Sequence, residues 1–206
     1  MPENASLHQM LAYWEARAPH YSCDDVFGRN IVKAYLDKLR PKSLIEVGCG
    51  NGELFPMYRN VAYVVAVDWS VNMLQRAELR KSRHYMPNVH IKRHDITRFS
   101  PSGHYDIALT RTVLMHIPPE HIEKTVRHIV KVADAFIIFE YYESVLLHPL
   151  SPHCWLHNYI PLFESNGCHM VEAYQRPDQP QVLFYFKKDD VVRHHEMPSG
   201  RLVVCH

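Results

Sequence analysis

The sequence predicts an α/β fold built on a mainly parallel sheet with helices on both faces. Three observations support this prediction. Short apolar runs alternate with segments of helical periodicity. A glycine-rich turn, Gly48-Cys-Gly-Asn-Gly52, directly follows one apolar run, and acidic residues end the next two runs. Strands that alternate with helices are typical of parallel sheets, because a crossover between parallel strands needs room for a helix.

The elements are expected in a regular order. Two amphipathic helices, over 7–17 and 25–39, each end before a proline. The first strand, 43–47, begins a strand–loop–helix unit around residues 44–54. Ser70 is the expected N-cap of a later helix. The remaining strands are expected at 61–67, 89–93, 105–110 and 136–141, and the remaining helices at 72–83, 118–132 and 156–166.

The last two expected strands, 169–174 and 182–187, are joined by a short linker, Arg-Pro-Asp-Gln-Pro-Gln. The linker is too short and too rich in proline for a helical crossover. These strands should therefore pair as an antiparallel hairpin. This gives a sheet of about seven strands, followed by a tail with a candidate strand at 202–205.

Length and composition indicate one domain over residues 1–206, with N-terminal helices at 1–40, a core at 41–187 and a tail at 188–206. The net charge of +1 gives no sign of a nucleic-acid partner. No apolar run is long enough for a membrane-spanning helix, so no membrane insertion is expected. Five dispersed cysteines without a C-x-x-C pair favour a reducing, cytoplasmic location.

The glycine-rich turn is the first candidate binding feature. Glycines after a strand allow a sharp turn and let a ligand approach the backbone closely. Alone, they also fit a tight turn without a ligand. Asp68 ends the second strand, where a carboxylate can accept both hydroxyls of a ribose, and Asp95 ends the third, where it can accept from an adenine amino group. Glu46 lies inside a buried strand and needs a partner there.

Four segments occur in a familiar order: E-V-G-C-G-N-G, A-V-D-W-S, H-D-I-T and Y-D-I-A-L-T-R-T-V-L-M-H-I-P. Over about residues 10–187, they resemble the successive motifs of class I S-adenosylmethionine (SAM)-dependent methyltransferases. The resemblance implies a Rossmann-like, doubly wound sheet closed by an antiparallel hairpin. It also implies SAM as the cofactor and methyl transfer as the activity.

The resemblance also implies roles for individual residues. The loop of Gly48, Cys49, Gly50 and Gly52 would pack against the methionine and ribose parts of SAM, and Glu46 would organise that loop or reach the SAM amino group. Asp68 would bind the ribose, and Thr110 and Arg111 would border the methionine. The adenine would lie among Trp69, Met73, Asp95 and Ile96. The N-terminal helices would close over SAM through Trp14 and Tyr21, for which core packing is the alternative.

A nicotinamide-dependent dehydrogenase is the alternative nucleotide-binding protein. Its G-x-G-x-x-G fingerprint requires glycine at the position that Glu53 occupies. A carboxylate there would repel a pyrophosphate, whereas SAM has no phosphate and carries a cationic sulfonium. The sequence therefore favours SAM.

Candidate acceptor-side residues follow the fourth and fifth strands. His116 is the best candidate for a general base, because histidine has a suitable unperturbed pKa, although a structural role in capping or packing is favoured over the base role. Glu140 and Tyr141, with Tyr142 and Glu143, could bind an amine, a sugar or a base. Arg111 could orient an anionic acceptor or pair with Glu140 or Glu143. The catalytic candidates are therefore His116, Tyr141, Glu140 and Arg111.

Histidine and cysteine gather in a later loop, where His153, Cys154 and His157 have a spacing that invites a metal hypothesis. No second ligand pair follows at zinc-finger spacing, so no metal site is predicted. The loop is expected to border the acceptor, with Trp155 as a lid or wall, and His194-His195 to be solvated surface.

The predicted activity is methyl transfer to an O or N atom of a small-molecule or saccharide acceptor, by a monomer or homodimer. A protein or nucleic-acid methyltransferase is one alternative, although Thr110-Arg111-Thr112-Val113 replaces the Asn-Pro-Pro-Tyr motif of amino-group DNA methyltransferases. A SAM-binding scaffold without turnover is the other.

Overall fold

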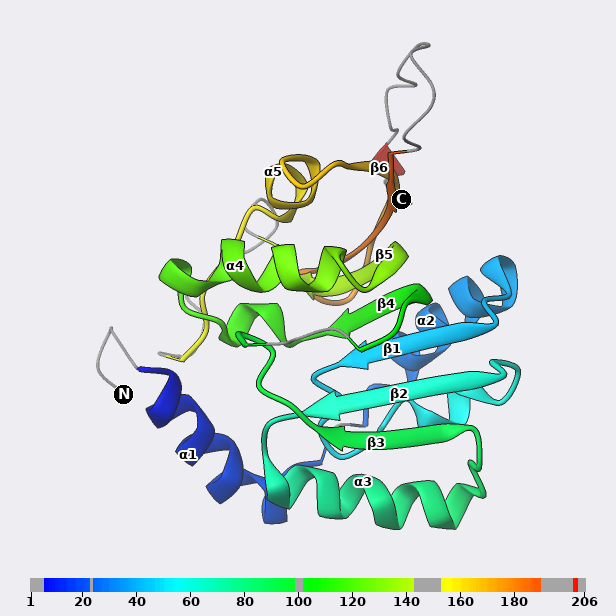
Figure 1. Cartoon of the computed structure of the whole chain (residues 1–206), viewed down its shortest axis with the longest axis vertical. Coiled ribbons are helices and arrows are strands. Elements are labelled where there is room, and N and C mark those ends of the chain that lie inside the picture. Colours follow the sequence, from blue (N-terminus) through cyan, green and yellow to red (C-terminus); the bar gives the residue numbers. More distant parts are fainter. Residues whose placement is uncertain (1–5, 23, 99–101, 143–152, 190–201, 204–206) are drawn as a thin grey trace.

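The structure is a computed structural model that describes residues 6–22, 24–98, 102–142, 153–189 and 202–203. One sheet of eight strands forms its centre, in the order β3-β2-β1-β4-β5-β7-β6-β8 (Figure 1). The strands are β1 (Ser43–Val47), β2 (Tyr63–Asp68), β3 (Val89–Arg93), β4 (Tyr105–Arg111), β5 (Ala133–Tyr141), β6 (Cys168–Gln175), β7 (Gln181–Lys188) and β8 (Leu202–Val203).

The sheet is parallel from β3 to β5, and β7 lies antiparallel between β5 and β6. The prediction of a mainly parallel sheet with a C-terminal antiparallel hairpin is confirmed. The chain winds outward from β1 to β2 and β3, then returns to β4 on the other side of β1. This reversal opens a crevice at the carboxyl ends of β1 and β4, which is where open α/β sheets bind ligands.

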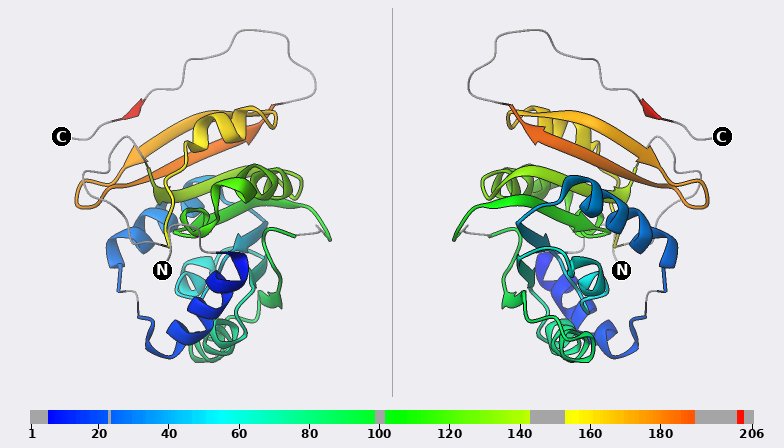
Figure 2. Two further views of the ribbon diagram at one scale, coloured as in Figure 1. Left: turned by 90° about the vertical axis from the view of Figure 1, so that its left-hand side faces the viewer. Right: turned by 90° about the vertical axis from the view of Figure 1, so that its right-hand side faces the viewer.

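Helices cover both faces of the sheet (Figures 1 and 2). One apolar core includes side chains of α4 (Pro119–Val130) and α5 (Tyr159–Glu164), and the other includes side chains of α2 (Val26–Leu39) and α3 (Val71–His84). α1 (Leu7–Arg17) lies instead at the carboxyl end of the parallel strands (Figure 1). The two faces form the stable scaffold, and α1 borders the ligand crevice.

Side-chain caps fix the starts of α2 and α3. Ser70 Oγ accepts a hydrogen bond from the Met73 backbone N–H at 3.1 Å, which confirms Ser70 as the N-cap of α3. Asp25 Oδ1 accepts from the Gly28 backbone N–H at 3.0 Å at the start of α2. Both helices end on a residue in the left-handed conformation, Arg40 and Tyr85.

Two expected helices differ from the prediction. Residues 55–58 after the glycine loop form a short 3-10 helix with Pro56 near its start, so the strand–loop–helix expected there lacks its α-helix. α5 begins at Tyr159 rather than near 156, and just before it the Trp155 backbone N–H donates to the Met115 carbonyl at 2.7 Å. That bond ties the chain before α5 to the turn that follows β4.

At the C-terminal edge, β8 pairs in parallel with β6, so the candidate strand at 202–205 is present at Leu202–Val203 and otherwise lies outside the described residues. Among the described residues, no helix is long and apolar enough to cross a membrane.

Candidate active site

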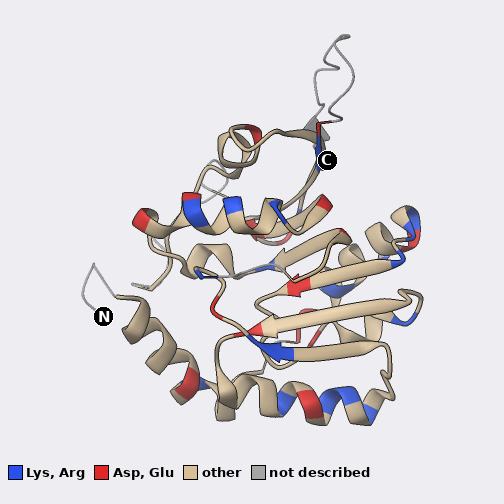
Figure 3. Cartoon of the chain, in the orientation of Figure 1, with Lys and Arg blue, Asp and Glu red and all other residues tan. Residues whose placement is uncertain are grey.

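A cleft with about 810 Å³ of empty space, partly open to solvent, lies at the carboxyl ends of β1, β2 and β4. Figure 3 shows charged residues at the carboxyl ends of three of the parallel strands: β2 ends on an acidic residue, and β3 and β4 each end on a basic residue. The lining comes from the glycine loop, the strand ends, α1 and the turn after β4. Its residues are Trp14, Tyr21, Glu46, Gly48, Cys49, Gly50, Asn51, Glu53, Leu54, Asp68, Trp69, Met73, Ile96, Arg111, Thr112, Val113, His116 and Ile117.

The glycine loop needs its glycines for different reasons. Gly48, Gly50 and Gly52 all have positive φ, a conformation that other residues rarely adopt. A Cβ on Gly48 would collide with the Val113 side chain, and one on Gly52 would collide with the Phe55 ring. A Cβ on Gly50 would meet open space. Gly50 therefore leaves a backbone surface that a ligand can approach closely.

Asp68 connects the loop to the helix that follows β2. Its Oδ2 accepts from the Gly50 N–H at 2.9 Å, and its Oδ1 accepts from the Ser70 N–H at 2.9 Å. Burial raises the pKa of Asp68, and the hydrogen bonds from Ser70 and Gly50 oppose that rise. Because each carboxylate oxygen can accept more than one hydrogen bond, Asp68 can still accept the hydroxyls of a ligand in the cleft.

Two cleft-lining side chains carry buried polar atoms. Asn51 Nδ2 has no hydrogen-bond partner within the described part of the chain. Burial raises the pKa of Glu46 to about 8, and an interaction with the Tyr58 hydroxyl opposes that rise, so Glu46 is largely protonated near pH 7. Buried polar groups are normally hydrogen-bonded, so the unpaired donor on Asn51 fits a ligand that brings an acceptor of its own.

Aromatic rings close one side of the cleft. The ring centres of Trp14 and Tyr21 are 5.8 Å apart, and those of Trp14 and His116 are 4.8 Å apart, both edge to face. Glu15, which follows Trp14, fixes this wall: its carboxylate accepts from the Val71 and Asn72 N–H groups at 2.7 and 2.9 Å. A carboxylate at a helix N-terminus is favourable, so α1 is held against the start of α3.

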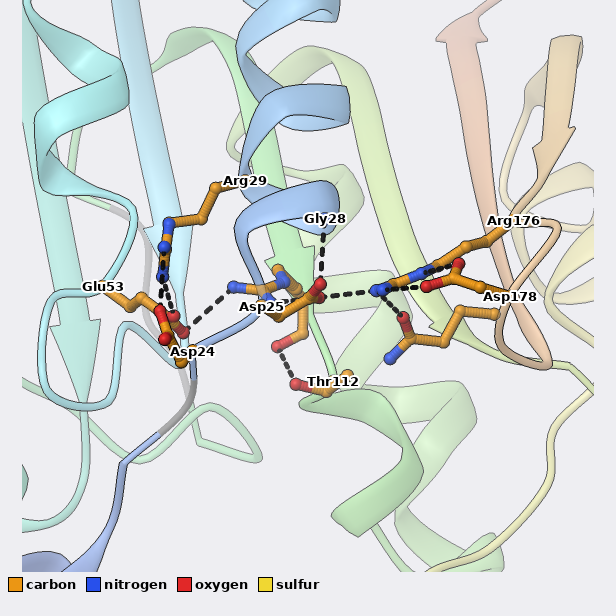
Figure 4. A network of polar contacts seen from close by, with 10 residues as sticks. Asp24, Asp25, Gly28, Arg29, Glu53, Thr112, Arg176 and Asp178 are labelled. Atoms are coloured by element: carbon orange, nitrogen blue, oxygen red, sulfur yellow. Dashed lines mark hydrogen bonds and ion pairs between the residues drawn. The ribbon is translucent and has the colours of Figure 1, made fainter.

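Beside the cleft lies a network of ion pairs centred on Asp25 (Figure 4). Asp25 Oδ2 accepts from Arg111 Nη2 at 2.7 Å and from Arg176 Nη1 at 2.6 Å. Arg111 Nη1 also donates to Glu53 Oε2 at 3.1 Å, and Arg29 Nη1 donates to Glu53 Oε1 at 2.5 Å. The network joins the ends of β4 and β6 to the start of α2. Arg111 thus pairs with Asp25 and Glu53, whereas the sequence suggested Glu140 or Glu143; Glu143 lies outside the described residues.

Glu140 lies behind the cleft rather than in it. It is fully buried at the end of β5, and its carboxylate accepts from the Val113 N–H at 3.0 Å and from the Leu114 N–H at 3.2 Å. Burial raises the pKa of Glu140 to about 7. The side chain fixes the turn after β4, and so it shapes the cleft from behind as a positioning residue.

His116 faces the cleft from the same turn. Its Nδ1 lies 3.2 Å from the His153 carbonyl oxygen and 3.6 Å from Cys154 Sγ. Burial lowers the pKa of His116 to about 4, so the ring is neutral near pH 7. The neutral ring has a lone pair that can accept a proton, but a pKa near 4 makes it a weak base. The sequence raised a metal hypothesis for His153, Cys154 and His157, but His157 does not join the other two. Its Nε2 lies 2.9 Å from the Ile117 carbonyl oxygen, away from His153 and Cys154.

Twelve of the sequence-predicted residues line the cleft, and five lie elsewhere: Gly52, Asp95, Thr110, Glu140 and Tyr141. Asp95 Oδ1 accepts hydrogen bonds from the Thr97 N–H and hydroxyl at 2.9 and 2.7 Å, so this oxygen is already bonded within its own turn. Thr110 is fully buried within β4. The lining residues that the sequence did not single out as ligand contacts are Asn51, Glu53, Leu54, Thr112, Val113 and Ile117.

These missed residues adjoin recognised motifs. Asn51, Glu53 and Leu54 continue the glycine loop, and the others follow Arg111 at the end of β4. Their proximity to the motifs was the available signal. Glu15 was also missed, because a single acidic residue beside Trp14 is indistinguishable in sequence from a solvated charge.

Comparison with known proteins agrees with this geometry. Residues 44–134 match the model of a family described as a methyltransferase domain. A chloroplastic magnesium protoporphyrin IX methyltransferase of Arabidopsis thaliana is 27% identical over 101 residues, which are 48% of this chain and 32% of that protein. An uncharacterised Haemophilus influenzae protein is 27% identical over 110 residues, 50% of this chain and 43% of its own length. The matches thus span about a third to two fifths of these curated relatives.

Solved structures extend the similarity to most of the chain. The magnesium protoporphyrin IX methyltransferase ChlM of Synechocystis PCC 6803, with bound S-adenosylhomocysteine (SAH), superposes with a TM-score of 0.69 at 17% identity, covering 90% of this chain and 89% of that one. A DhpI–SAH complex has a TM-score of 0.67 at 17% identity, covering 89% and 96%. At these identities the similarity establishes the fold. With the matched segment at 44–134, it identifies a methyltransferase domain of the Rossmann-like α/β type in this chain.

Proposed function

We propose that this chain binds SAM in the cleft and transfers its methyl group to a small-molecule acceptor. The observation that carries the proposal is the placement of Asp68: a buried carboxylate at the end of β2, bonded to the glycine loop and lining the same cleft as Trp69 and Met73. This arrangement suits a nucleoside, whose ribose would meet the carboxylate and whose base would meet the apolar side chains.

The donor's amino-acid part fits the other end of the cleft. A carboxylate would satisfy the unpaired donor on Asn51, and an ammonium group would bind Glu46 and help to ionise it. Arg111 adds positive charge there, although its guanidinium already pairs with Asp25 and Glu53. Bound SAM would supply a methyl group activated by a sulfonium, so the protein has mainly to align an acceptor and exclude water. Trp14 and Tyr21 would provide that exclusion.

The acceptor would approach along the turn after β4, where His116 is neutral and turned toward the cleft. An O or N acceptor that must lose a proton could give it to His116. Glu140 would act by holding the turn, and Tyr141 lies beyond the cleft lining. The saccharide acceptor, the cytoplasmic location and a monomeric or dimeric state stay predictions.

The test is a methyl-transfer assay with labelled SAM and a panel of phenols, carboxylic acids, amines and sugars. Transfer to a member of the panel is the expected result, and SAH should form in equal amount. SAM binding without transfer to the panel, peptides or nucleic acids would favour a scaffold. Transfer to peptides or nucleic acids alone would contradict the small-molecule acceptor and leave the cofactor assignment standing.

A further inference from the structure

We propose that His116, His153 and Cys154 form a zinc site at the mouth of the cleft. The ligand atoms of these three side chains lie within 4.8 Å of one another, and all three residues are partly exposed. Two imidazoles and one thiolate are ligands that Zn²⁺ prefers. Three protein ligands with an open fourth position are typical of catalytic rather than structural zinc sites.

The best-defined pair already has the spacing that zinc requires. His116 Nδ1 and Cys154 Sγ are 3.6 Å apart. Zinc–nitrogen bonds of about 2.0 Å and zinc–sulfur bonds of about 2.3 Å at a tetrahedral angle place the two ligand atoms about 3.5 Å apart. His116 Nδ1 also lies 3.2 Å from the His153 carbonyl oxygen, so zinc binding requires the His116 proton to reside on Nε2 and the Nδ1 lone pair to turn from that carbonyl toward Cys154. A small shift of the His153 ring, within its contact with Tyr13, would bring the third ligand atom to zinc distance.

Packing around the two imidazoles restricts their motion. Tyr13 packs on His153 with ring centres 4.3 Å apart, and Trp14 packs on His116 with ring centres 4.8 Å apart. Both aromatic residues belong to α1, which Glu15 fixes to the start of α3. Surrounding contacts that orient ligands strengthen metal binding, so α1 would support the zinc ligands as well as the cleft wall.

The position of the site suggests what the open coordination position would do. His116 lines the cleft, so a bound ion would border the space where the acceptor of the proposed function lies. Zinc lowers the pKa of a bound hydroxyl or water, and it binds thiols as thiolates. In the zinc-loaded protein, His116 would be a ligand, and the metal would remove the need for a histidine base. This consequence rests on the proposed function, whereas zinc binding itself does not.

The test uses the full chain, stripped of metal by a chelator and titrated with Zn²⁺ in the absence of SAM. One zinc ion per chain is expected. Replacement of zinc by Co²⁺ should produce a sulfur-to-cobalt charge-transfer band in the near ultraviolet. Cys154→Ser should remove the band and weaken zinc binding by more than about 100-fold, because loss of mere supporting contacts already costs 10- to 100-fold.

Cys168→Ser is the matched control, since Cys168 is a free cysteine buried in β6 and outside the three-residue group. It should keep both the band and the affinity. Zinc bound equally by wild type and by the Cys154→Ser variant would show an adventitious site and overturn the proposal. A cobalt spectrum of the wild-type protein without the thiolate band would also overturn the proposal. This second measurement does not depend on the folding of any variant. Neither result would affect SAM binding.

Discussion

Glu15 in α1 accepts a hydrogen bond from the backbone N–H of Val71 at 2.7 Å, so a carboxylate from the N-terminal helix lies at the first turn of α3. The Glu15 carboxylate also accepts from the Ser70 hydroxyl at 3.1 Å, and the Asn72 side-chain amide donates to the Glu15 carbonyl at 3.0 Å. Because Trp14 precedes Glu15 and lines the cleft, this contact sets the width of the proposed SAM site.

The first prediction concerns this contact. Glu15→Ala should destabilise the fold by about 1 kcal/mol, the usual cost of removing a side-chain cap, and should weaken SAM binding by loosening Trp14. Thermal unfolding and calorimetry would measure the two effects. Glu123→Ala, at an exposed position of α4, should change neither quantity. Equal SAM affinity for the two variants would show that α1 does not shape the site.

Asp25 should make the stability of the fold depend on pH. Although burial raises its pKa, the hydrogen bonds from Arg176, the Gly28 N–H and Arg111 outweigh that effect and lower the pKa of Asp25 to about 2. A depressed pKa means that the stabilisation is present above about pH 4 and is lost as pH falls from about 4 to about 2. The contribution is about 2 kcal/mol.

Urea unfolding between pH 5 and pH 2 would measure this contribution. Asp25→Asn should lose the corresponding part of the slope, and at pH 7 it should be less stable by about 2 kcal/mol. Arg111 and Arg176 would lose their shared partner but keep Glu53 and Asp178. Asp24→Asn is the neighbouring control, since Asp24 is exposed and pairs with Arg29 rather than with Arg111 or Arg176 within the described part of the chain. The account of the network would fail if the two variants had equal stability.

Asp68 should be the main determinant of SAM affinity. Asp68→Ala removes a carboxylate that would accept the ribose hydroxyls and that already holds Gly50, so binding should weaken by about 1.5–3 kcal/mol. Asp134→Ala, at an exposed position near the start of β5, is the control and should bind SAM normally. An unchanged affinity of the Asp68 variant would remove Asp68 from the ribose site.

His116 should affect turnover more than SAM binding. As a general base, it would contribute about 10²- to 10⁴-fold, so His116→Ala should lower turnover by that factor and leave SAM affinity nearly intact. Because its pKa is about 4, turnover should be flat between pH 6 and pH 8 with respect to this group and fall toward pH 4. His169→Ala, at an exposed site, is the control.

The same His116 assay run with and without a metal chelator separates two roles. A base works in either condition, whereas a zinc ligand matters only when the ion is present. If His116→Ala retained full turnover in both conditions, neither role would stand.

Much of the fold was predictable from the sequence because local signals and tertiary structure agree. β-Branched runs form the buried strands, Ser70 caps α3, and the short proline-containing linker before Gln181 forces a hairpin. The position of β7 between β5 and β6 was not predictable in this way, since strand order depends on contacts between distant segments. α5 was overestimated at its start, where residues 156–158 follow the contact of Trp155 with Met115, a contact between segments far apart in the chain.

The site was predictable in part. Gly50 was identified because a tight turn requires glycine, which is visible in the local sequence. Asp68 and Trp69 were identified because they lie where a predicted parallel strand ends. The partners of Arg111 could not be identified, since Asp25 is 86 residues away in the chain. The group of His116, His153 and Cys154 could not be predicted from the sequence either. In the sequence His157 is close to Cys154, whereas the fold brings His116, which is 38 residues away in the chain, next to Cys154.

SAM binding is tested most directly by a calorimetric titration of the full chain with SAM, followed by SAH and NAD. One SAM should bind per chain, SAH should displace it, and NAD should not bind, because Glu53 occupies the position where a dinucleotide site requires glycine. Absence of SAM binding by a folded chain would contradict the assignment of the cleft to SAM, and tighter binding of NAD than of SAM would assign the cleft to a different cofactor.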